Sequence, residues 1–122
     1  MTLLDDFYHV SGHSLSDGTL HASLVFHPGH RIFEGHFPGQ PVVPGVCMMH
    51  IVKELVEMFL APGVKTRLVR ADSAKFLIMI NPLETPTVEA EVRYGPDEKV
   101  VARFYNGTTT FFKLTGLLKI CG

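Results

Sequence analysis

One segment, residues 43–60, constrains the fold most, because its length and pattern predict a single long helix. Pro62 and Gly63 follow it and predict its end. Its polar residues gather within one narrow arc of the helical wheel, and they are His50, Lys53, Glu54 and Glu57. A helix this apolar over the rest of its circumference is expected to be wrapped by other structure.

The rest of the chain predicts strands. Leu20–Phe26 alternates apolar and polar side chains and is expected to run on towards Phe33. After the helix, strands are expected over residues 67–80, 87–94, 99–105 and 108–120. Gly95-Pro96-Asp97 and Asn106-Gly107 predict the turns that join the last three. One buried helix followed by an antiparallel meander is an α+β pattern, expected as a single domain over residues 1–122.

Composition narrows the function classes. Hydrophobic residues make up 46% of the chain and charged residues only 19%, so we expect surplus apolar surface to be covered in a homodimer. A net charge of −1 gives no electrostatic reason to expect nucleic-acid binding. Residues 1–8 lack the features of a signal peptide, and we expect no membrane-spanning stretch. Two cysteines make no disulfide framework, which favours a reduced, cytoplasmic setting.

A proline- and glycine-rich stretch, residues 35–46, precedes the helix. Its prolines fix backbone angles, and its apolar residues indicate a buried, rigid loop rather than a surface linker. His36 is the one histidine within it. A rigidly held imidazole suits general acid–base chemistry, although a structural histidine in a tight turn is the alternative.

Gly35-His36-Phe37-Pro38-Gly39, with Pro41 and Pro44-Gly45-Val46, closely resembles the signature of the hot-dog-fold 3-hydroxyacyl-[acyl carrier protein] dehydratases of bacterial fatty-acid synthesis. The likeness continues at Ala74-Lys75-Phe76. The resemblance implies a hot-dog fold, in which a long central helix is wrapped by a curled antiparallel sheet and two chains form a dimer. It places each active site at the dimer interface, with a histidine from one chain and an acidic residue from the partner's helix.

The resemblance also assigns roles to residues. His36 becomes the base that removes the C2 proton of a 3-hydroxyacyl thioester, and backbone N–H groups at Gly45 and Val46 bind the thioester oxygen. Phe37 and Phe76 become candidates for the acyl-chain pocket. The product is the trans-2-enoyl thioester, and the chain is predicted to be a hydro-lyase that needs no cofactor and no metal.

His50 stands where this family carries its catalytic acid, fourteen positions after His36. Three interpretations stay open. His50 donates the proton to the leaving hydroxyl, with support from Glu54 one helical turn later. Alternatively, His50 belongs to the polar arc with Lys53 and Glu57, or the chain has lost activity.

The implied partner is an acyl carrier protein, and the implied assembly is a homodimer, a higher even-numbered oligomer, or a hetero-oligomer with another dehydratase. The densest basic group, a candidate for carrier docking, is Lys65, Arg67, Arg70 and Lys75. Against the lyase stand two alternatives: a non-catalytic hot-dog subunit or acyl-binding partner, and thirdly a hot-dog thioesterase. His27-x-x-His30 and Cys47-x-x-His50 match no four-ligand zinc spacing.

Overall fold

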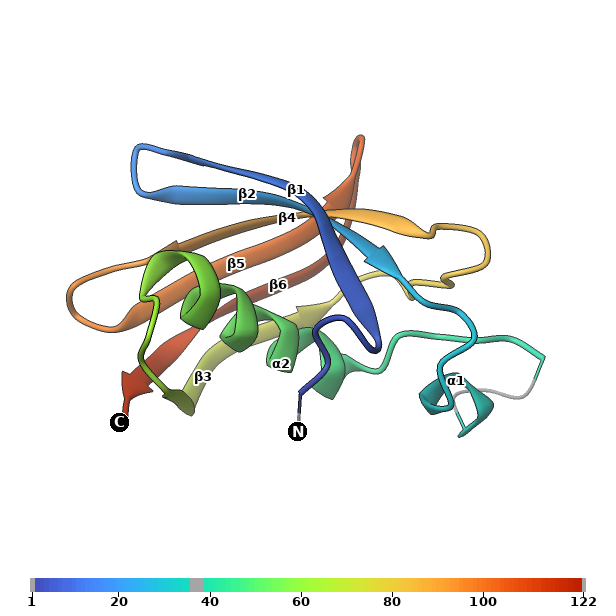
Figure 1. Ribbon diagram of the computed structural model, residues 1–122, viewed down its shortest axis with the longest axis horizontal. Helices are drawn as coiled ribbons and strands as arrows, with labels where there is room; N and C mark the ends of the chain where they lie inside the picture. The colour runs from blue at the N-terminus through green and yellow to red at the C-terminus, as the bar shows by residue number, and fades with distance from the viewer. Residues whose placement is uncertain (1, 36–38, 122) are drawn as a thin grey trace.

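The computed structural model describes residues 2–35 and 39–121 (Figure 1). In chain order, the elements are β1 (Tyr8–Ser16), β2 (Thr19–Phe26), α1 (Ile32–Gly35), α2 (Gly45–Leu55), the π-helical turn η1 (Val56–Leu60), β3 (Thr66–Phe76), β4 (Thr87–Tyr94), β5 (Lys99–Asn106) and β6 (Thr109–Ile120). No helix in these residues is long and apolar enough to cross a membrane.

The strands form one antiparallel sheet in the order β1-β2-β4-β5-β6-β3. Tight turns join β1 to β2, β4 to β5, and β5 to β6, and Asp17 and Gly18 hold the first of them with φ of 52° and 74°. β3 follows α2 in the chain and pairs with β6 at the sheet's edge. The sheet curls, and α2 lies across its inner face (Figure 1).

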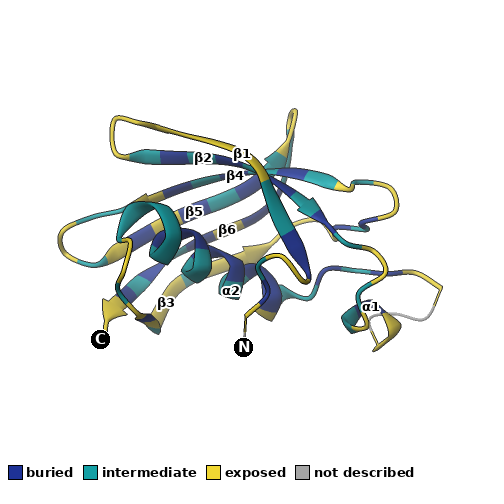
Figure 2. Ribbon diagram, viewed as in Figure 1, coloured by how far each residue is buried: buried dark blue, intermediate teal, exposed yellow. Residues whose placement is uncertain are grey.

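The core lies between α2 and the inner face of the sheet. The helix turns its dark, buried side toward the strands (Figure 2), and that side consists of Cys47, Met48, Ile51, Val52 and Leu55. Inward-facing strand residues such as Leu24, Phe104 and Phe112 are completely buried against it. Each large apolar side chain buried in this way stabilises the fold by about 1.5–3 kcal/mol.

These observations confirm the α+β prediction of a central helix in a curled antiparallel sheet. β4 has the predicted bounds. The helical segment ends at Leu60 as expected, but it begins at Gly45 rather than at residue 43, because Pro44 is its extended N-cap residue with ψ of 145°. Its last turn is π-helical rather than α-helical.

Two strand predictions need correction, and one strand is missing from the predictions. The strand expected to continue from Phe26 towards Phe33 ends at Phe26, and Phe33 lies in the short helix α1. β3 ends at Phe76 rather than at Ile80, since Ile80 turns into the core and its carbonyl accepts a hydrogen bond from the Val43 N–H. β1 was not predicted, because most of its residues are exposed and give little apolar alternation.

Candidate active site

The largest apolar cavity lies where α2 begins. It measures about 800 Å³ and is lined by residues 42–46, Met48 and residues 76–79. Val46 is 67% exposed and Phe76 is 51% exposed, so the cavity opens onto a strongly apolar surface. The structure therefore brings Gly45, Val46 and Phe76, from two separate sequence motifs, to one place.

Gly45 and Phe76 fit tightly against each other. A Cβ atom at position 45 would lie only 2.7 Å from Cε1 of Phe76. The Phe76 ring also stacks on Phe112, with ring centroids 5.2 Å apart. Glycine at the start of α2 thus allows an aromatic ring to lie against the helix N-terminus.

Gly45 and Val46, the first two residues of α2, line this cavity. The N–H groups of Cys47 and Met48 both donate to the Pro44 carbonyl, at 3.0 and 3.2 Å. Pro44 provides no side-chain cap. The N–H groups of Gly45 and Val46 occupy positions that have no acceptor within a helix, and the helix dipole there favours negative charge.

His50 lies one turn further along α2, beside a smaller pocket of about 190 Å³ lined by Val46, Met49, His50, Lys53 and Leu68. Val46 lines both this pocket and the larger cavity. The His50 side chain is 19% exposed, but its Nε2 atom is buried and has no hydrogen-bond partner within residues 2–35 and 39–121. That atom lies 3.7 Å from Oε2 of Glu54, within ion-pair range but beyond hydrogen-bond distance.

Glu54 is held mainly by the N-terminal segment. Its Oε2 accepts a hydrogen bond from the Leu3 N–H at 2.9 Å, and its Oε1 accepts one from the Tyr8 hydroxyl at 3.2 Å. Burial, and then the neighbouring Glu54 carboxylate, raise the pKa of Tyr8 above its ordinary value, so the hydroxyl remains a donor. Tyr8 and Leu3 have no motif around them, and the sequence did not single them out.

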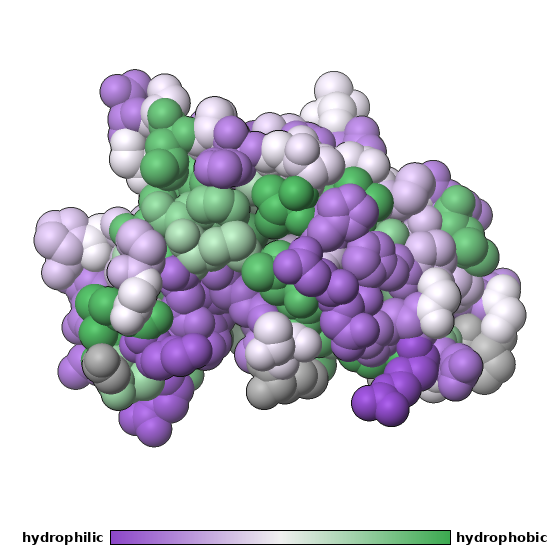
Figure 3. Space-filling view, viewed as in Figure 1, coloured by the Kyte–Doolittle hydropathy of each residue, from purple (hydrophilic) through white to green (hydrophobic). Residues whose placement is uncertain are grey.

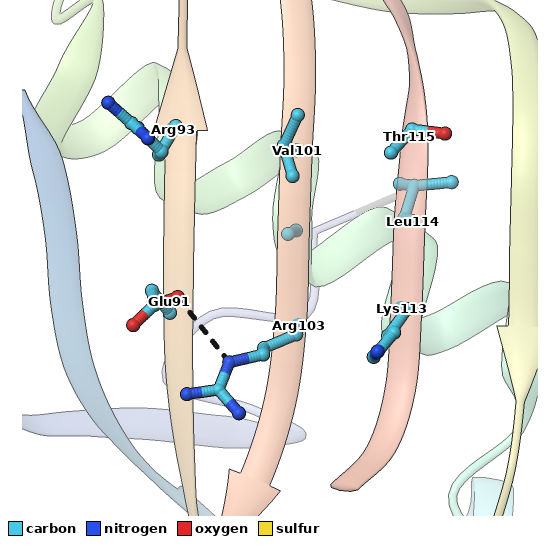
Figure 4. A pocket seen from close by; sticks show the side chains of 8 residues that line it. Glu91, Arg93, Val101, Arg103, Lys113, Leu114 and Thr115 are labelled. Carbon is cyan, nitrogen blue, oxygen red and sulfur yellow. Dashed lines mark hydrogen bonds and ion pairs between the residues drawn. The ribbon is translucent and has the colours of Figure 1, made fainter.

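The outer face of the sheet carries a row of charged residues at matching positions. Lys75 on β3 lies opposite Lys113 on β6, which lies opposite Arg103 on β5. Figure 4 shows Arg103 reaching toward Glu91 on β4, at 3.4 Å, while Lys113 stands apart from that pair. Among the residues described, neither Lys75 nor Lys113 forms an ion pair. Three basic residues thus stand side by side.

The remaining histidines and the helix cysteine have local partners. His27 contacts His9 at 2.7 Å and the carbonyl of Asp6 at 2.8 Å, while His30 contacts the Asp6 carboxylate at 3.1 Å. Within residues 2–35 and 39–121, no group of three or more ligating side chains could hold a metal ion. Cys47 is buried in the core, and burial raises the pKa of its thiol.

His36 and Phe37 lie outside the described residues, so their assigned roles stay predictions. The described residues stop at Gly35 and begin again at Gly39. The described part of the site therefore consists of the cavity at the start of α2, with His50 and Glu54 on the next turns of the same helix.

Comparisons with known proteins bear on the family and the fold. The model of the ApeI-like family, described as ApeI dehydratase, matches residues 12–112. The chain is 33% identical over 67 residues to the 3-hydroxyacyl-[acyl-carrier-protein] dehydratase FabZ of Clostridium acetobutylicum. That match covers 51% of this chain and 48% of the relative, so the alignment spans about half the length of each.

Two solved structures share the fold. The dehydratase heterocomplex ApeI:P from Xenorhabdus doucetiae superposes with a TM-score of 0.75 at 21% identity, over 94% of this chain and 98% of that one. An uncharacterized protein from Erwinia carotovora subsp. atroseptica superposes with a TM-score of 0.66 at 22% identity, over 91% and 92%. The fold is therefore the hot-dog fold that the signature implied, and the chain belongs to the ApeI-like family of dehydratases.

Proposed function

We propose that this chain dehydrates a 3-hydroxyacyl thioester, carried by an acyl carrier protein, to the trans-2-enoyl thioester. The observation that carries the proposal is the apolar cavity at the start of α2, which adjoins a helix N-terminus. His50 lies beside a second pocket on the same helix, and the resemblance implies that it serves the site whose base comes from the partner chain. An acyl chain needs apolar walls, and the growing charge on the thioester oxygen needs donors. The family membership supports the same chemistry.

In this mechanism His36 takes the proton from C2. The electron pair left on C2 forms the C2=C3 double bond as the C3–O bond breaks, and the N–H groups of Gly45 and Val46 stabilise the negative charge on the thioester oxygen meanwhile. His50, as an imidazolium, gives its proton to the departing hydroxyl, which leaves as water. His36 ends protonated and His50 neutral, so one proton exchange with solvent restores each.

We further propose that the working form is a dimer joined near the β3 edge. β3 has an unpaired side, and exposed edge strands are natural pairing sites. Large exposed apolar side chains gather on it and on the segment that follows, namely Val69, Phe76, Leu77, Ile78 and Met79. Covering them in a dimer would close the cavity and bring a second chain to the site.

The carrier protein is proposed to dock on the basic row of Lys75, Lys113 and Arg103. Like charges placed directly across neighbouring strands repel, by roughly 0.2–1 kcal/mol per pair, and an acidic partner would relieve that repulsion. The row ends at Lys75, next to Phe76 of the cavity. Within the group identified from the sequence, Arg70 is bound to Asp72 at 2.6 Å, and within the row Arg103 is bound to Glu91 at 3.4 Å, so Lys75 and Lys113 are the residues proposed to contact the carrier most directly.

A second candidate function is that of a non-catalytic subunit. The replacement of the family's acid by His50 favours it, and so does the likeness to a chain of a dehydratase heterocomplex. In that case the chain would pair with an active dehydratase through the same β3 edge. A thioesterase remains third, since the signature matches dehydratases over a dozen positions.

The deciding test is turnover of a short 3-hydroxyacyl carrier-protein thioester by the purified chain alone, followed by mass spectrometry of the enoyl product. We expect product, and we expect His36→Ala to lower kcat/KM by roughly 10²–10⁴. No dehydration by the natural chain, with dehydration restored on adding a second dehydratase subunit, would favour the non-catalytic subunit. Free acid in place of enoyl thioester would indicate a thioesterase.

A further inference from the structure

The buried end of the His50 ring has one candidate partner among the described residues. Nε2 is shielded from solvent and makes no hydrogen bond, which is costly for a polar atom. The carboxylate of Glu54 faces it at 3.7 Å. A carboxylate is an acceptor alone, so an Nε2 atom that carries a hydrogen is favoured at this place over a bare lone pair.

Glu54 itself has little freedom to move. Its side chain is 10% exposed, and three groups donate to it: the Leu3 N–H, the Tyr8 hydroxyl and, at 3.5 Å, the Leu4 N–H. Tyr8 is completely buried and Leu3 is 2% exposed. The N-terminal segment therefore fixes the carboxylate in front of His50.

Among the described residues, Lys53 does not compete with His50 for Glu54. Lys53, its neighbour on α2, is bound to Glu57 at 2.9 Å. Glu57 in turn accepts hydrogen bonds from the Thr66 N–H at 2.6 Å and the Thr66 hydroxyl at 2.8 Å. The helix thus carries two carboxylates with separate partners, and Glu54 is the one that faces His50.

We propose that Glu54, fixed by Tyr8 and the Leu3 amide, is a positioning residue that holds the hydrogen of His50 on Nε2 and leaves Nδ1 to face the pocket. The His50 side chain is 19% exposed although its Nε2 atom is buried, so its solvent contact lies elsewhere on the side chain, and His50 lines the pocket of about 190 Å³. Nδ1 is then the nitrogen that meets a ligand. This assignment adds to the proposed dehydration, in which the Nδ1 hydrogen of the imidazolium goes to the leaving hydroxyl and the Nε2 hydrogen stays.

Nitrogen-15 NMR of the full chain reads the His50 tautomer directly, without any turnover. At a pH where His50 is neutral, we expect the hydrogen on Nε2 in the natural chain. In Glu54→Gln we expect the population to shift toward the Nδ1–H form, because the amide can donate to Nε2. In Tyr8→Phe, which keeps the buried ring, we expect a smaller shift in the same direction.

Glu89→Gln is the control, since it removes a hydrogen-bonded carboxylate on β4 that contacts neither His50 nor Lys53. It should leave the tautomer unchanged. Hydrogen on Nδ1 in the natural chain would overturn the assignment. So would a tautomer that stays the same in Tyr8→Phe and in Glu54→Gln, since Glu54 would then only anchor the N-terminus. If Glu54→Gln does not fold, Tyr8→Phe decides alone.

Kinetics separate this proposal from the dehydratase proposal. With turnover, Glu54→Gln should lower kcat about tenfold to a hundredfold and Tyr8→Phe about fivefold, with KM nearly unchanged, as expected for lost hydrogen bonds to charged and neutral groups. A chain without turnover whose tautomer still follows Glu54 would overturn the dehydration and keep the positioning role. Turnover in a chain whose His50 tautomer does not change in Glu54→Gln would support the dehydration and overturn the positioning role.

Discussion

At the scale of single residues, the contact between Gly45 and Phe76 joins two motifs that are distant in the sequence. Phe76 comes from β3, and Gly45 opens α2. The ring lies so close to the helix that a methyl group at position 45 would meet it at 2.7 Å. Because the helix N-terminus provides the proposed thioester-binding amides, this contact links the acyl cavity to the oxygen-binding groups.

Gly45→Ala should therefore be destabilising, by about 1–3 kcal/mol, the usual cost of overpacking. The measurement is thermal or urea unfolding, and adding Phe76→Leu should recover part of the loss. Gly12→Ala is the control, because a Cβ there would have no neighbour within 4 Å. A Gly45→Ala variant as stable as the natural chain would show that the Phe76 ring moves aside freely.

At the scale of elements, Glu57 joins the end of the helix to the start of β3. It lies in η1 and bonds to Thr66, the first residue of β3. Burial alone would raise the pKa of the Glu57 carboxyl, but hydrogen bonds from Lys53 and Thr66 outweigh it and lower the pKa below its ordinary value. Folding therefore favours the ionised form of the Glu57 carboxyl.

A carboxyl with a lowered folded pKa adds stability above its unfolded pKa of about 4.3, and that stability is lost as the pH falls through the folded value. Glu57→Gln should thus be less stable than the natural chain at pH 7, and the difference should shrink below about pH 4. Urea unfolding over a pH series measures this. Glu84→Gln, at an exposed position, should show no such difference. A stability difference between Glu57→Gln and the natural chain that stays constant with pH would contradict this coupling between stability and the ionisation of Glu57.

At the scale of the whole molecule, one face combines polar and apolar groups. Green and purple side chains interleave over the side that carries α2 (Figure 3). The large exposed apolar residues after β3 include Met79, which is 72% exposed. Such surface is expected to be covered by another chain.

Light scattering at micromolar concentration should give twice the mass of one chain or a higher even multiple. Met79→Asp, beside the cavity, should shift the equilibrium towards monomer. Leu15→Asp, on β1 at the opposite edge and 55% exposed in the natural chain, should leave the mass unchanged. A natural chain that stays monomeric would contradict the proposed dimer.

The sequence predicts the two ends of a strand best where strict alternation is bounded by turn residues, as in β4. β4 was located to the residue, because Val88, Ala90 and Val92 face the core and their neighbours do not. β1 was missed because it is an exposed edge strand, and the Asp17-Gly18 turn that precedes β2 was its one local signal. The sequence predicts strand at residues 77–80, because a short apolar run does not reveal where a chain stops pairing with its neighbouring strand.

The candidate site was predictable where a side chain belongs to a motif. Gly45, Val46 and Phe76 line one cavity, while the roles that the signature implies for them stay predictions, and Glu54 lies near His50 through helical spacing. The hydrogen bonds from the Leu3 N–H and the Tyr8 hydroxyl to Glu54 could not be predicted. They join residues far apart in the sequence, and nearly every residue has a backbone N–H. The row of Lys75, Lys113 and Arg103 depends on strand register, which composition does not contain.

His50 is proposed to do the work of the acid that the resemblance places at this position. The most direct measurement compares kcat/KM of the natural chain, His50→Ala and His50→Glu on one 3-hydroxyacyl carrier-protein thioester. We expect His50→Ala to lose most activity, roughly 10²-fold or more, and His50→Glu to keep or raise it, because a buried protonated carboxyl can donate the same proton. Equal activity in all three forms would contradict the claim and leave His50 a residue of the polar arc.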